Sequence, residues 1–208
     1  MGNGRHSKLP KGVRDITKAL GKRILKQYKG EDDERFMHSE YTLNANINRS
    51  KYRFAQDSVE AEALRFAWLH NCQRVAYAVD LRLDGYDVES MPRTHDDTFA
   101  YADASFPNSF LNVYKNAKVI ELNGTSEELY KQLYSNYLSK PGARAIVFNN
   151  WEGKNSGHAW NLVRTTKRVL GVDGQVDRVF DPRENFDRAE EAIFFWSASS
   201  VYKYNSNK

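Results

Sequence analysis

The order of helix-like and strand-like segments constrains the fold of this chain most. Apolar residues favour helix over residues 57–69, 74–83 and 125–138. Four β-rich runs follow in the C-terminal third, with the sequences ARAIVFNNW, GHAWNLVRT, DRVFD and EAIFFWSAS. Gly, Asn, Asp or Pro separates these runs, which is typical of an antiparallel sheet with short loops. Helices gathered early and strands gathered late predict an α+β fold.

Length and composition indicate one domain of catalytic size. The chain has 208 residues, of which 40% are hydrophobic, enough to bury a single sizeable core. Its single cysteine, Cys72, excludes an internal disulfide and a cysteine-based metal cluster, so the fold does not depend on an oxidising compartment. His95, Asp96 and Asp97 are adjacent, but without a further ligand cluster a solvated loop is the better interpretation. We therefore expect no metal and no cofactor.

The N-terminal segment differs in charge from the rest of the chain. Residues 1–29 contain nine of the 31 Lys and Arg residues and one acidic residue, and the acidic run GEDDE follows at residues 30–34. Apolar residues recur there every three or four positions, which predicts a basic amphipathic helix: Val13, Ile16, Leu20, Ile24 and Tyr28. We divide the chain into this helix with its linker, residues 1–34, and a catalytic domain, residues 35–208. The helix is expected to pack on the domain or to join it to a longer polypeptide; contact with nucleic acid or an anionic membrane is the less favoured alternative.

Neither a membrane span nor a secretory signal is evident in the sequence. No run approaches the about 18 consecutive apolar residues of a membrane-spanning helix. The N-terminus, MGNGRHSKLPKGVRD, lacks the apolar core of a signal peptide. We therefore expect synthesis in the cytoplasm, and delivery into a target cell would need specialised secretion or a phage.

Cys72 lies where a predicted helix begins, in HNCQRVAYAVDLRLDG. The first turn of a helix has unpaired N–H groups and the positive end of the helix dipole, which favour a thiolate over a thiol. The same N–H groups stabilise an oxyanion that forms when a thiolate attacks a carbonyl. Position alone makes Cys72 a candidate nucleophile, although a lone cysteine is more often a small buried core residue.

A nucleophilic cysteine needs a base, and His158 is the histidine best placed to act as one. It lies in EGKNSGHAWNLV, where glycines and polar residues precede an apolar strand, so its imidazole is expected at the mouth of a sheet. Asp181, in DRVFDPREN, ends an adjacent predicted strand before a proline and is the candidate to orient the imidazole. Taken singly, an isolated histidine is more often a surface or core residue, and an aspartate before proline is an ordinary turn former.

In chain order, Cys72, His158 and Asp181 combine a helix start, a strand start and a strand end, which is the layout of a papain-like site. Three motifs between about residues 44 and 185 resemble those of the papain-fold toxins, also written Tox-PL. NCQRVAYAVDLRLDGYDVES is similar to that family's Asn-Cys-Gln helix, KPGARAIVFNNWEGKNSGHAWNLV to its Pro-Gly-Ala-Arg and Gly-His strands, and FDPRE to its Asp-Pro-Gln block. The resemblance implies a papain-like fold, in which N-terminal helices with the cysteine at a helix start pack on an antiparallel sheet.

The same resemblance implies a protein-glutamine deamidase in which Cys72 is the nucleophile, His158 the general base and Asp181 the orienting acid. It also implies a toxin or effector, bacterial or phage-associated, whose partners are a substrate protein with a reactive glutamine and an immunity or inhibitor protein. A papain-like peptidase and a transglutaminase share the catalytic steps and remain alternatives. A non-catalytic binding module that uses the basic N-terminal helix is an alternative of another class.

Residues around the three candidates are expected to bind substrate or to stabilise an oxyanion. Asn71 and Gln73 flank the cysteine, and Trp151 and Trp160 flank the histidine, although aromatic residues at strand edges more often belong to the core. Arg183 stands where the family's block has glutamine. No glutamine precedes the cysteine at the spacing that papain uses for its oxyanion hole, so the partner of the cysteine N–H in that hole is not identified.

Overall fold

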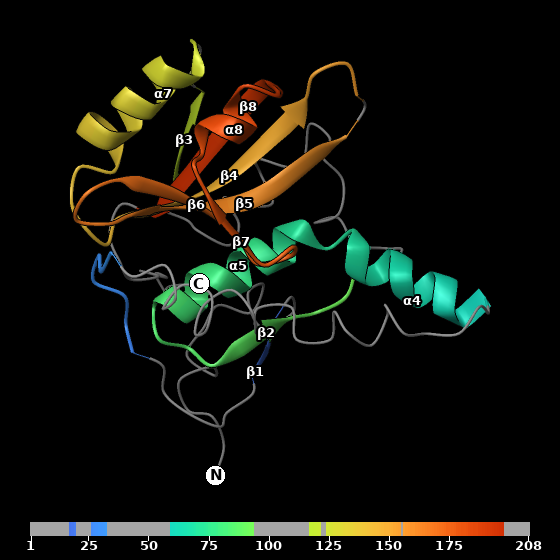
Figure 1. Cartoon of the computed structure of the whole chain (residues 1–208). Coiled ribbons are helices and arrows are strands. Elements are labelled where there is room, and N and C mark those ends of the chain that lie inside the picture. Colours follow the sequence, from blue (N-terminus) through green and yellow to red (C-terminus); the bar gives the residue numbers. More distant parts are fainter. Residues whose placement is uncertain are drawn as a thin grey trace, which may run out of the picture.

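The computed structural model describes residues 17–19, 26–32, 59–93, 117–121, 124–154 and 156–197. Its elements in chain order are β1 (Thr17–Ala19), α4 (Val59–Leu69), α5 (Cys72–Leu83), β2 (Val88–Ser90), β3 (Ala117–Glu121), α7 (Ser126–Gln132), the π-helix η4 (Leu133–Tyr137), β4 (Arg144–Trp151), β5 (Gly157–Arg164), β6 (Val169–Asp173), β7 (Arg178–Phe180), α8 (Arg183–Phe186) and β8 (Ala189–Ser197). Helices lie on both sides of a six-stranded antiparallel sheet (Figure 1). The α+β fold predicted from the sequence is confirmed. Within the described ranges, no helix has the length and apolar character needed to cross a membrane.

The six-stranded sheet forms the middle layer, with the strand order β3-β8-β4-β5-β6-β7. In β4, Ile146 and Phe148 belong to the apolar cluster around α5, whereas Ala145 and Val147 belong to a second cluster with α7. Successive side chains of a strand point to opposite faces, so this alternation places α5 against one face and α7 against the other (Figure 1). Both faces of β4 are therefore buried, which explains its nearly continuous apolar sequence.

Helix α5 is buried along its whole length after its first residue. Three residues that the sequence predicts on one face are at most 1% exposed: Val75, Val79 and Leu83. The charged residues of the helix are buried as well because they have partners; the Asp80 carboxylate, for example, accepts a hydrogen bond from Arg144 Nε at 2.8 Å. The helix is thus held from several sides, and this packing fixes the position of Cys72, its first residue.

The most buried of these charges, Arg82, gives a stability prediction. Its side chain is 0% exposed, donates to the Val88 carbonyl at 2.9 Å and lies 3.5 Å from the Asp87 carboxylate. Arg82→Met should lower the free energy of unfolding by about 3–5 kcal/mol in urea titrations, because it leaves a buried carboxylate without this counter-charge. Lys131→Met, which removes an exposed ion pair with Glu127, is the matched control and should change little. Equal losses in the two variants would contradict the burial argument.

The predicted N-terminal helix is wrong where the structure describes it. Thr17–Ala19 is a strand, β1, which pairs antiparallel with β2. Residues 26–32 contain no helix, and Tyr28, 2% exposed, joins the core around α5 while its N–H donates to the Leu83 carbonyl at 2.8 Å. The remaining residues of the predicted apolar face and the boundary after residue 34 lie outside the described residues: Val13, Ile16, Leu20 and Ile24.

Strand β6 is absent from the sequence-based prediction. Its sequence, VLGVD, contains Gly171 at the centre, and a glycine inside a strand lowers strand propensity. The structure gives the reason for the glycine: a Cβ there would lie 2.5 Å from the ring of Phe180 on β7. The glycine therefore lets the aromatic ring lie directly on the backbone of β6.

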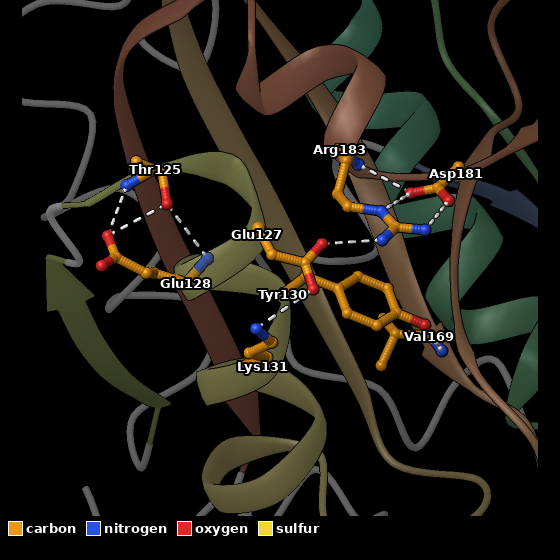
Figure 2. Close-up of polar contacts among 8 residues, drawn as sticks. All are labelled: Thr125, Glu127, Glu128, Tyr130, Lys131, Val169, Asp181 and Arg183. Atoms are coloured by element: carbon orange, nitrogen blue, oxygen red, sulfur yellow. Dashed lines mark hydrogen bonds and ion pairs between the residues drawn. The ribbon is translucent and has the colours of Figure 1, made fainter.

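Helix α7 begins as the sequence predicts. The Thr125 hydroxyl accepts a hydrogen bond from the Glu128 N–H at 3.3 Å, and the Glu128 carboxylate accepts one from the Thr125 N–H at 2.9 Å (Figure 2). This reciprocal pair is a capping box, which satisfies two N–H groups that the first helical turn leaves free. The predicted helix over 125–138 continues as a π-helix from Leu133 to Tyr137.

Candidate active site

Cys72 is the first residue of α5, and its thiol is free and partly exposed. Asn71, which precedes the helix, makes no side-chain hydrogen bond to the first helical turn. The positive end of a twelve-residue helix and its uncapped N–H groups therefore face the thiol. The helix start predicted for the cysteine is confirmed.

His158 is the second residue of β5, at the mouth of the sheet as predicted. Its Nε2 lies 2.6 Å from Oδ2 of Asp173, the last residue of β6. The two side chains are 18% and 7% exposed, so water competes little for this contact. The other carboxylate oxygen of Asp173, Oδ1, accepts the Gln175 N–H at 3.0 Å, which fixes the carboxylate in turn.

The thiol of Cys72 lies near enough to His158 to help raise the pKa of its ring. Because Asp173 occupies Nε2, Nδ1 is the ring nitrogen left for a contact with the thiol. Burial lowers the pKa of His158, but the charge and hydrogen bond of Asp173, together with the thiol, outweigh burial and raise that pKa to about 10. At neutral pH the ring is therefore an imidazolium between a carboxylate and a cysteine.

The raised pKa of His158 predicts how stability depends on pH. The unfolded histidine titrates near about 6.5, so folding takes up a proton above that pH. The resulting stabilisation is complete below about pH 6.5 and is lost as pH rises through the folded pKa. In a Cys72→Ala background, which removes the titrating thiol, the free energy of unfolding should fall with rising pH by up to about 1.4 kcal/mol per unit.

The test compares urea titrations of Cys72→Ala with those of Cys72→Ala/His158→Gln across this range. The second protein should lack the pH-dependent part, whereas His70→Gln, which changes an exposed histidine, should retain it. The fall in the free energy of unfolding should end below pH 10, because alanine at position 72 removes the contribution of the thiol to the pKa of His158. Parallel curves for the two proteins would contradict the raised pKa.

Asp181 does not meet His158 in the structure, which corrects the sequence-based assignment. Its carboxylate accepts hydrogen bonds from Arg183 Nε at 2.9 Å and from Arg183 Nη2 at 2.5 Å (Figure 2). Arg183 Nη1 also reaches Glu127 on α7 at 2.8 Å, so Asp181 belongs to a link between α7 and α8. The hydrogen bonds from Arg183 lower the pKa of Asp181 and keep it charged in that link. Asp173 makes the contact with His158 that the sequence predicts for Asp181.

The sequence around Asp173 has a pattern of its own. Asp173 and Gln175 stand two positions apart, as the Asp and the Gln do in the block that FDPRE resembles, whereas FDPRE itself has only Asp-Pro. The sequence favours Asp181 because Asp-Pro is intact before Arg183 and because β6 is not predicted as a strand. Since β6 lies beside β5 in the sheet, its last residue can reach the histidine.

The two residues flanking the cysteine have different surroundings. The Asn71 side chain is 2% exposed and donates to Ser90 Oγ at 3.3 Å and to the Met91 carbonyl at 3.2 Å, so its amide holds the helix start to β2. Gln73 is 5% exposed, and within the described part of the chain its buried Oε1 has no hydrogen-bond partner. Of these two amides, only that of Gln73 is not already committed to the fold.

The two tryptophans also differ. The Trp151 ring lies nearly parallel to that of His158, with centroids 6.4 Å apart and an interplanar angle of 17°. The Arg188 guanidinium lies 5.0 Å from the Trp151 centroid and brings a second cation to this side of the site. Trp160 is 1% exposed and donates to Asn149 Oδ1 at 2.6 Å, so it belongs to the core on the α7 side.

The polar loop with His95, Asp96 and Asp97 lies outside the described residues, so its interpretation as a solvated loop stays a prediction. Among the residues that the structure describes, no group of His, Cys, Asp or Glu side chains has the arrangement of a metal site. The candidate site consists of a thiol, an imidazole and a carboxylate on three elements: α5, β5 and β6.

The chain is similar to a known family and to a solved structure. The sequence profile of a family described as "Papain fold toxin 1, glutamine deamidase" matches residues 70–177. That match includes Cys72, His158 and Asp173 and ends before Asp181. Among solved structures, the Salmonella effector SpvD, in its G161 variant, is similar with a TM-score of 0.54 and 14% sequence identity, over 96% of this chain and 93% of that chain. No curated protein matches the sequence. The papain-like fold that the motifs imply is confirmed.

Proposed function

Since this chain belongs to the papain-fold toxin family of glutamine deamidases, we propose that it deamidates a glutamine side chain of a target-cell protein. Cys72, His158 and Asp173 act as nucleophile, acid–base and orienting carboxylate. The observation that carries this assignment is the 2.6 Å contact of His158 Nε2 with Asp173, beside a Cys72 thiol that is near enough to help raise the pKa of the same ring. A base held by an acid and facing a nucleophile is the arrangement of an acyl-transfer triad.

The geometry supports a two-step reaction. The Cys72 thiolate attacks the carboxamide carbon of glutamine, and the His158 imidazolium gives its proton to the nitrogen, so that ammonia leaves and a thioester remains. Neutral His158 then takes a proton from water, whose oxygen attacks the thioester carbonyl. The thiolate leaves, the imidazolium is restored, and glutamate is the product. Asp173 keeps Nδ1 directed at the sulfur and stabilises the imidazolium in both steps.

Substrate groups are assigned from the residues left available around the thiol. The first-turn N–H groups of α5, which the Asn71 side chain does not cap, are placed to bind the developing oxyanion. We assign Gln73 to the carboxamide end of the substrate, because its own amide oxygen has no partner among the described residues. Trp151, beside the imidazole, is assigned to the aliphatic part of the glutamine. Asn71 and Trp160 are left to structural roles.

The family favours deamidation over the other reactions that this triad supports. A peptidase performs the same steps on a backbone amide, and a transglutaminase replaces water with an amine. The toxin family and the effector-like fold favour a protein target in a recipient cell, reached by specialised secretion, with an immunity protein in the producing cell. A non-catalytic module is the alternative of another class, and it predicts no dependence on Cys72.

A lysate experiment separates these reactions. Bacterial and eukaryotic lysates are incubated in parallel with wild type or Cys72→Ala, and released ammonia and new protein N-termini are both measured. We expect ammonia without new termini from the wild type, and neither product from the variant. New termini without ammonia identify a peptidase, and ammonia with cross-linked products identifies a transglutaminase. Either of these results, or no product from any lysate, overturns the deamidase proposal.

A further inference from the structure

The turn after β6 contacts both halves of the catalytic pair. Asp173, at the end of β6 where the turn begins, contacts His158. Two residues later, the Gln175 side chain donates to the Leu69 carbonyl, where the connection from α4 to Cys72 begins. Building on the proposed function, we infer that Gln175 is a positioning residue that sets the thiol of Cys72 against His158. One short turn thereby fixes both partners of the thiol–imidazole contact.

Gln175 is bound to the α4–α5 connection through its amide nitrogen. Nε2 lies 2.7 Å from the Leu69 carbonyl, 3.3 Å from the Trp68 carbonyl and 3.3 Å from Oδ1 of Asn71. The side chain is 7% exposed, so water cannot readily replace these contacts. No charge is involved, which makes the contacts independent of pH.

These acceptors are the groups that decide where α5 begins. Trp68 and Leu69 are the last two residues of α4, whose final carbonyls have no partner within the helix. The two N–H groups of Gln175 are shared among these carbonyls and Asn71 Oδ1, and the shortest contact is with Leu69. Only two residues separate the end of α4 from Cys72, so fixing the first fixes the second within a short distance.

Asn71 anchors the same connection from the opposite side. Its Nδ2 donates to Ser90 Oγ and to the Met91 carbonyl at the end of β2. The residue before the cysteine is therefore held between the β6–β7 turn and the end of β2. A displacement of about 1 Å is enough to cost about 100-fold in a positioned reaction, so loss of either anchor should uncouple the thiol from the imidazole.

The turn itself is tied to the triad. The Gln175 N–H donates to Asp173 Oδ1 at 3.0 Å, while Oδ2 of the same carboxylate contacts His158. A movement of the turn thus moves Asp173, which contacts His158, together with Gln175, which binds the segment before Cys72. An Asp-x-Gln spacing suits the site for this reason. The aspartate contacts His158, and the glutamine binds the segment that precedes Cys72.

The test measures the alkylation rate of Cys72 by iodoacetamide between about pH 5.5 and 9.5, which needs no knowledge of the substrate. Gln175→Met keeps the side-chain length and removes both N–H donors. We expect wild type to react rapidly at pH 6, as reactive cysteines at the start of a helix and beside a histidine do. Gln175→Met should react at least tenfold more slowly at pH 6 and follow the profile of an ordinary thiol, with a midpoint near about 8.5.

The control is Gln132→Met, at the end of α7 on the other side of the sheet, which should leave the profile unchanged. Gln175→Asn, whose amide is too short to reach Leu69, should shift the profile in the same direction and serves if the methionine variant does not fold. A purely structural role would lower the urea midpoint of either folded variant and leave the profile of its native thiol as in wild type. That result overturns this inference alone, whereas an ordinary profile in wild type overturns the proposed function with it.

Discussion

Replacing Cys72 with alanine is expected to lower the rate of glutamine conversion by about 10⁴-fold or more, because the variant has no group that can form the thioester. The site is partly exposed at this position, so the loss of one sulfur atom should cost little stability. Conversion is measured as ammonia released from lysate protein, and folding as the urea midpoint. A folded variant that keeps wild-type conversion would show that the thiol does not take part.

Cys72→Ser sharpens this test by keeping a polar atom of similar size in place. Serine is the weaker nucleophile, since its hydroxyl stays protonated beside an imidazolium whose pKa is raised to about 10. We therefore expect Cys72→Ser to be nearly as inactive as the alanine variant while retaining the shape of the site. Substantial activity in the serine variant would require a base stronger than the one that the structure shows.

The second large effect distinguishes two aspartates that the sequence places eight residues apart. Asp173→Ala should lower conversion by about 100-fold or more, because His158 loses the carboxylate that orients its ring and stabilises its charge. Asp181→Ala should leave conversion close to wild type, because Asp181 is bound to Arg183 on the α7 side. Both changes remove one carboxylate near the end of a strand, so each is the control for the other. The reverse order of effects would restore the original assignment of Asp181.

The features that the sequence predicts correctly are local ones. Helix α7 begins at Thr125 because the capping residues lie three positions apart, and α5 begins at Cys72 because its apolar residues recur at helical spacing. His158 is the second residue of a strand that begins at a glycine, and a change from polar to apolar residues indicates this strand start. These signals depend on neighbours within a few positions, so the chain alone displays them.

The features that the sequence does not reveal depend on residues far away along the chain. The strand at Thr17–Ala19 forms because β2 offers backbone partners, and this pairing overrides a helical spacing of apolar residues. Strand β6 contains a central glycine that makes room for Phe180, so its strand character is visible only in the folded sheet. Because β6 is not predicted, the sequence does not indicate that Asp173 lies at a strand end near His158. Asp173 contacts His158 because β6 lies beside β5 in the sheet. A pattern of neighbouring residues in the sequence does not reveal this strand order.

The measurement that tests the central claim most directly is the reaction in heavy-oxygen water. Lysate protein is treated with wild type or Asp173→Ala, the reaction is stopped, and peptides prepared in ordinary water are mapped by mass spectrometry. The account predicts glutamates at former glutamine positions that carry one heavy oxygen in the side chain, abundant with wild type and rare with Asp173→Ala. Heavy oxygen at new chain ends instead of side chains, or equal labelling by the two proteins, would contradict it.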